Sequence, residues 1–69
     1  MRLSTRNQLR ATVTSVELGA VMASVKVELP DGQHITASIT REAVEDLGLA
    51  TGDDVTVLVK STEVMIGKD

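Results

Sequence analysis

The sequence contains no cysteine and no aromatic residue, and it has a single proline and a single histidine. Without cysteine the chain cannot form a disulfide, and with His34 as its only histidine it lacks the ligand set of a structural zinc site. Without aromatic side chains, the core must be built from smaller apolar residues, which make up 42% of the 69 residues. Because a domain of this size usually needs support beyond one small core, we expect the chain to oligomerise.

Long apolar runs are also missing. No stretch approaches the roughly 20 apolar residues that are needed to cross a bilayer. Polar residues follow Met1 and Leu3 at once, so the start of the sequence does not resemble a secretion signal. We therefore predict a single domain over residues 1–69, located in the cytoplasm and without a membrane partner.

Basic residues are too few for a broad positive surface, since the formal net charge is −3. This balance argues against a nucleic-acid partner, but a small anion site needs only a few local donors. The chain also lacks a catalytic constellation: His34 has no evident partner, and the adjacent carboxylates of Asp53 and Asp54 are typical of a solvated turn. The five glycines are scattered and form no phosphate-binding loop. We predict that the protein is not an enzyme.

β-strand patterns dominate the chain. The clearest is 21–29, where apolar and polar residues alternate as in a half-buried strand. Turn residues at Gly19, Pro30–Gly32 and Gly52 separate the apolar stretches. The predicted strands are 9–18, 21–29, 33–39, 55–60 and a short last strand, 64–66.

One helix is predicted, over 41–47. Thr40 before it is a favourable N-cap, and Gly48 after it can adopt the left-handed conformation that ends a helix. Val44 and Leu47, three residues apart, give this helix one apolar face.

Five strands with one short helix between the third and the fourth indicate an all-β, OB-like barrel. Four large apolar residues fall on faces of the strands that should be polar, which favours a surface buried between subunits. These residues are Leu18, Met22, Leu58 and Met65.

Three short segments are rich in hydrogen-bond donors: 4–8, 40–43 and 60–62. Each has an ordinary interpretation by itself, as a polar terminus, a helix cap and a solvated strand end. Each also has the chemistry of an oxyanion site, because a cation, hydroxyl groups and free N–H groups together bind such ions.

The combination of these segments resembles a known family. Ser4-Thr5-Arg6-Asn7-Gln8-Leu9 resembles the Ser-Ala-Arg-Asn-Gln opening of the molbindins and of related TOBE domains in molybdate transporters and molybdate-responsive regulators. The resemblance covers essentially the whole chain. It continues through Ile39-Thr40, Glu45-Asp46-Leu47-Gly48-Leu49, Gly52-Asp53 and Val59-Lys60-Ser61-Thr62-Glu63-Val64-Met65.

This resemblance implies a molbindin of the single-domain Mop/TOBE type, which binds molybdate or tungstate for intracellular molybdenum storage, buffering or homeostasis. It implies a homohexamer made of three dimers, with oxyanions at subunit interfaces and neither an organic cofactor nor a directly ligated metal cation. The ligand would be reached from one subunit by Ser4, Thr5 and Arg6, and from the other by Thr40, Ala43, Lys60 and Ser61.

The chain departs from the family pattern at three positions. Thr5 and Ala11 stand where the family often has alanine and glycine, and Ala43 stands where relatives often have serine. Any contact of Ala43 with the ion would therefore use its backbone N–H. A second class of site is implied around Gly19, Ala20 and Val21.

A DNA-binding regulator is the alternative interpretation. The segment 40–49, followed by Gly52-Asp53, also resembles AbrB-type domains, and a nucleic-acid-binding OB domain is a variant of the same idea. Both would be expected to carry basic residues beside the segment or aromatic stacking platforms, and this acidic chain has neither.

Overall fold

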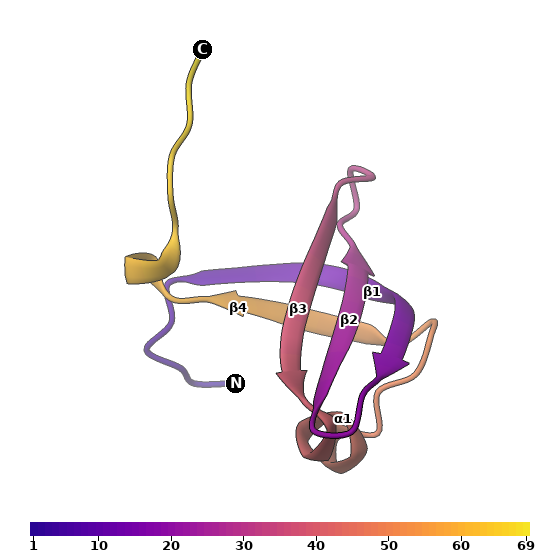
Figure 1. Cartoon of the computed structure of the whole chain (residues 1–69). Helices are drawn as coiled ribbons and strands as arrows, with labels where there is room; N and C mark the ends of the chain where they lie inside the picture. Colours follow the sequence, from indigo (N-terminus) through magenta and orange to yellow (C-terminus); the bar gives the residue numbers. More distant parts are fainter.

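The computed structural model describes residues 1–69 and contains one sheet of four antiparallel strands, in the order β3-β2-β1-β4 (Figure 1). One α-helix lies between the third and fourth strands, and a single 3₁₀ turn follows the fourth. The elements are β1 (Asn7–Leu18), β2 (Met22–Glu28), β3 (His34–Thr40), α1 (Arg41–Leu47), β4 (Asp54–Val59) and η1 (Ser61–Glu63).

β1 is long enough to pair with two different strands. Its first half, Asn7–Thr12, pairs with β4, and its second half, from Thr12 to Leu18, pairs with β2. The register with β2 shifts between Val13 and Ser15, so Thr14 forms a β-bulge. A bulge bends its strand and increases the twist, and the sheet accordingly curls around this point (Figure 1).

The core lies inside the curl and consists of small side chains. Six residues are buried, all of them alanine or valine, and the most buried is Val13. The predicted alternation along β2 is confirmed, because Ala23, Val25 and Val27 are buried while their neighbours are not. The buried set is Ala11, Val13, Ala23, Val25, Val27 and Val44.

The predicted helix is confirmed from its first to its last residue. The Thr40 hydroxyl accepts the N–H of Ala43 at 3.1 Å, and Gly48 ends the helix with φ of 64°. The predicted apolar face is wrong at Leu47, which is 69% exposed. Leu49 packs against the core instead, because the left-handed turn directs the chain back and the Leu49 N–H donates to the Val44 carbonyl at 3.1 Å.

The turn between β2 and β3 is held by Asp31, whose carboxylate accepts the side-chain and backbone N–H groups of Gln33 at 2.6 and 3.1 Å. These two hydrogen bonds lower the pKa of Asp31 below its ordinary value, with the side chain of Gln33 as the larger cause. The predicted Pro30–Gly32 turn is thus confirmed, with Gly32 at φ of 92°.

The predicted fifth strand is wrong. Val64–Ile66 pairs with no other strand, and Figure 1 shows the chain after η1 running away from the sheet. The sheet therefore has four strands and is open between β3 and β4, rather than closed into a five-stranded barrel. The composition of this segment favours a strand, but a strand also needs a backbone partner, and η1 turns the chain away from β4.

No helix of the structure is long and apolar enough to span a membrane.

The turn at Gly19 leaves no space for a side chain, since an added Cβ would lie 2.6 Å from the Met22 carbonyl oxygen. We expect Gly19→Ala to lower the free energy of unfolding by about 1–3 kcal/mol, as overpacking against backbone does. Thermal denaturation followed by circular dichroism measures this change. Gly67→Ala, where nothing lies within 4 Å, is the control and should leave the melting temperature unchanged.

Candidate functional site

Two basic residues lie just outside the end of the sheet where β1 begins and β4 ends. Asn7 and Val59 form the outermost pair of the β1–β4 ladder. Arg6 directly precedes this pair on one strand and Lys60 directly follows it on the other. The antiparallel pairing therefore brings residues 54 positions apart in the chain to one end of the sheet.

Neither of these cations is neutralised within the chain. The only ion pairs are Arg41 with Glu45 and His34 with Glu28. Glu63 is the acidic residue nearest to Lys60 in sequence, and it makes no ion pair with it. Both cations are exposed, so their charge is available to an anion from solution.

Free backbone donors surround the two cations. Six N–H groups at this end of the sheet donate to no acceptor within the chain, and the hydroxyl groups of the same segments make no hydrogen bond either. N–H groups in bends and first helical turns are the usual ligands of oxyanions. The six groups belong to Ser4, Thr5, Arg6, Lys60, Ser61 and Thr62.

We call residues 4–6 together with 60–62 the donor cluster. It contains five of the seven predicted site residues, so the structure brings together Ser4, Thr5 and Arg6 with Lys60 and Ser61. Two adjacent side chains hold the cluster in place: Asn7 Nδ2 donates to the Val59 carbonyl at 3.1 Å, and Gln8 Nε2 donates to the Thr5 carbonyl at 3.0 Å. Both residues belong to the Arg-Asn-Gln motif, and the sequence predicts no function for either of them.

The remaining two predicted residues, Thr40 and Ala43, lie elsewhere. Thr40 pairs with Met22 at the start of β2, and this end of β2 pairs with the end of β1 at Leu18. The donor cluster lies at the other end of β1, twelve residues away along a strand that rises about 3.3 Å per residue. Figure 1 accordingly shows α1 at the foot of the curled sheet and η1 well away from it.

The start of α1 offers fewer free donors than its sequence indicates. The Ala43 N–H is engaged with the Thr40 hydroxyl, and the Arg41 N–H donates to the Val21 carbonyl at 2.8 Å. The Arg41 guanidinium is also engaged, with Glu45 at 2.8 Å and the Gly19 carbonyl at 3.4 Å. The Thr40 hydroxyl accepts one hydrogen bond and retains its own proton to donate.

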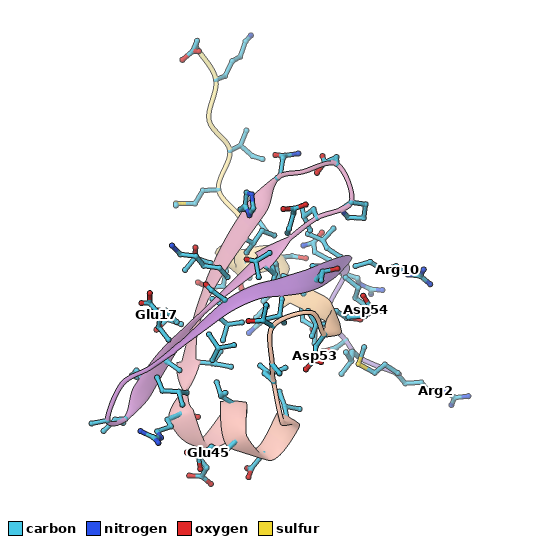
Figure 2. All side chains as sticks on the ribbon, turned by 90° about the vertical axis from the view of Figure 1, so that its right-hand side faces the viewer. Arg2, Arg10, Glu17, Glu45, Asp53 and Asp54 are labelled. Atoms are coloured by element: carbon cyan, nitrogen blue, oxygen red, sulfur yellow. The ribbon has the colours of Figure 1, made fainter.

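Two hollows of the surface have a different chemistry. The larger, of about 580 Å³, is lined in part by Arg10, Glu28 and Asp54. Figure 2 shows Arg10 and Asp54 on the same side of the sheet. Two carboxylates against one cation repel a dianion, so this hollow is not an oxyanion site. The smaller, of about 270 Å³, includes Gly19 and therefore lies at the predicted second site.

Comparison with known proteins identifies the family. The TOBE domain model matches residues 3–66. The chain is 50% identical over 66 residues to the molybdenum-pterin-binding protein MopA of Rhodobacter capsulatus, an alignment that covers 96% of this chain and 25% of MopA. The chain thus spans about a quarter of that relative's length. It belongs to the TOBE domain family.

Within this family, solved structures narrow the similarity to molybdate-binding proteins. The molybdate binding protein from Sporomusa ovata is 44% identical, and the two chains superpose with a TM-score of 0.94 over 99% of this chain and 100% of that one. ModG, described as a cytoplasmic molybdate-binding protein and solved with molybdate bound, is also 44% identical. Its TM-score is 0.84, over 88% of this chain and 43% of ModG.

The hydroxyl of Thr40 stabilises the helix as its N-cap, and this contribution can be measured without any ligand. We expect Thr40→Ala to lower the free energy of unfolding by about 1 kcal/mol, because the Ala43 N–H loses its acceptor. Thr40→Ser keeps the hydroxyl and should unfold like the unsubstituted protein. Urea denaturation of both variants measures the difference, and equal loss in both would show that the methyl group, not the cap, stabilises the helix.

Proposed function

We propose that this protein binds molybdate, and tungstate in the same way, as an intracellular store or buffer of the ion. The observation that carries this proposal is the donor cluster: two unpaired cations, Arg6 and Lys60, flank one strand pair and are surrounded by free N–H groups. The family relationship supplies the identity of the ion.

The donor cluster suits a tetrahedral dianion. Such an ion accepts several hydrogen bonds at once, and each bond to a charged acceptor contributes about 1.5–3 kcal/mol. Binding needs no bond cleavage and hence no general base or nucleophile, and we propose a binding protein rather than an enzyme. Size and donor geometry would exclude the smaller sulfate, whereas molybdate and tungstate are too similar to be separated in this way.

We propose that each complete site lies between two copies of the chain. Thr40 and Ala43 lie too far along the sheet to reach the donor cluster of their own chain, so they would meet the ion bound by another copy. The donor cluster, with Ser4, Thr5, Arg6, Lys60 and Ser61, would come from one copy, and Thr40 and Ala43 from another. The Thr40 hydroxyl would donate its proton to the ion, and Ala43 would act through the cap that orients this hydroxyl.

The donor cluster has an electrostatic consequence. Arg6 and Lys60 of one chain flank the same strand pair, so both cations would face the same ion. The two cations repel each other in the free protein, and a bound dianion would relieve this repulsion. We therefore expect the ion to stabilise the assembly as well as to occupy it.

An oligomer is supported by the apolar surface. The four residues predicted at subunit contacts are all exposed in the single chain, from Leu58 at 43% to Met65 at 92%. Val64–Ile66 extends away from the sheet without a partner strand. We propose a homohexamer of three dimers that buries these side chains, located in the cytoplasm as described for ModG.

Calorimetric titration tests the function. We expect tight binding of molybdate and tungstate, at least tenfold weaker binding of sulfate and phosphate, and fewer than two ions per chain. Lys60→Met should weaken molybdate binding by about tenfold or more, because a charge-assisted donor is lost. Lys68→Met removes an equal charge from the end of the chain and should bind as before.

Two results would contradict this function: no heat of binding with molybdate in an assembled oligomer, or tight, salt-sensitive binding of a labelled oligonucleotide. The second would instead support the regulator interpretation.

The assembly is tested by light scattering. We expect a mass about six times the chain mass of 7.3 kDa. Met65→Gln should shift the mass towards smaller species, because a polar amide replaces an apolar side chain at the proposed contact. Lys68→Gln, three residues further along, is the control. A monomer at all concentrations would exclude shared sites.

A further inference from the structure

Asn7 joins the two halves of the donor cluster. Its side-chain Nδ2 donates to the Val59 carbonyl at 3.1 Å, across the outermost pair of the β1–β4 ladder. Both residues are half-buried, whereas Arg6 and Lys60 beside them are exposed. This hydrogen bond is therefore the last fixed point before the two strands separate, and it links the residue after Arg6 to the residue before Lys60.

Gln8 holds the N-terminal half of the cluster by a different contact. Its Nε2 donates to the Thr5 carbonyl at 3.0 Å, three residues back along the chain. No other hydrogen bond holds any of residues 1–6. Thr5 is also the only one of these six residues that is not exposed. The bond constrains residues 5–8 and so orients the backbone N–H groups of the loop.

Such constraints matter for the binding of a small ion. Ordering a free chain segment costs backbone entropy at every residue. If residues 4–6 were unconstrained, this cost would be subtracted from the affinity at the moment of binding. A loop that is already ordered binds more tightly, and it also presents its donors at fixed positions.

We propose that Asn7 and Gln8 are positioning residues that preorganise the donor cluster and thereby set its affinity and its selectivity among tetrahedral oxyanions. This inference rests on the proposed function. Neither side chain touches the ion: Asn7 fixes the distance between the two halves of the cluster, and Gln8 fixes the conformation of the N-terminal half. A loop held at fixed size suits the larger molybdate, whereas a loosened loop can close around the smaller sulfate.

Two variants remove these contacts separately. Asn7→Ala deletes the bond to Val59, and Gln8→Met deletes the bond to Thr5 while it keeps the length of the side chain and adds no charge. Titration with molybdate should show about a fivefold loss of affinity in each, carried by a more unfavourable binding entropy. The ratio of molybdate to sulfate affinity should fall as well, and the number of ions bound per chain should not change.

A matched control lies elsewhere in the same sheet. Thr14 Oγ1 donates to the Lys26 carbonyl at 3.1 Å, which is also a bond from a side chain to a backbone carbonyl. Thr14→Val removes it without a change of shape. This variant should keep the molybdate affinity and the selectivity, even if its melting temperature falls as far as that of Asn7→Ala.

The positioning role can be tested apart from the proposed function by measuring backbone order in the ion-free protein. NMR relaxation of the Thr5 and Arg6 amides should show lower order parameters in Gln8→Met than in the unsubstituted protein. Unchanged order, unchanged affinity in both variants, or an equal loss of affinity in Thr14→Val would each overturn the positioning role. Failure of the unsubstituted protein to bind molybdate would overturn the proposed function, and the selectivity claim with it.

Discussion

The pairing of β1 with two strands is the constraint on which the rest of the structure depends. One half of this strand bonds to β4 and the other half to β2, and the bulge at Thr14 bends the strand between them. The bend places small side chains inside the curl, where Val13 is almost fully buried. It also determines what each end of the sheet carries: the donor cluster at the start of β1, and α1 with its cap beside the far end.

The small, purely aliphatic core and the proposed division of the site between copies both favour assembly. The single chain leaves Met65 and Ile66 almost fully exposed and its sheet open between β3 and β4. It also holds the donor cluster and Thr40 too far apart to contact one ion. A second copy would supply both the missing apolar contacts and the missing donors, so assembly and ion binding would be coupled in this protein.

Local structure was predictable where the residues that cause it lie within one short stretch of sequence. The alternation in β2 required only that one face be buried, and the helix required only Thr40 and Gly48 at its ends. The prediction failed at Val64–Ile66 and at Leu47, because strand pairing and burial depend on what else lies nearby. The functions proposed for Asn7 and Gln8 were equally unpredictable, since a side-chain hydrogen bond leaves no periodic pattern in the sequence.

The sequence by itself determined the class of fold, the three donor segments and, through its resemblance to a family, the kind of ligand to test. Only the tertiary structure decided which donors lie together. Antiparallel pairing brings Arg6 to Lys60 across 54 positions of sequence, and the same pairing separates both from Thr40. Hydrogen bonds between strands that are distant in sequence determine which residues become neighbours. The register of these strands depends on the bend of β1 and cannot be predicted from a short stretch of sequence.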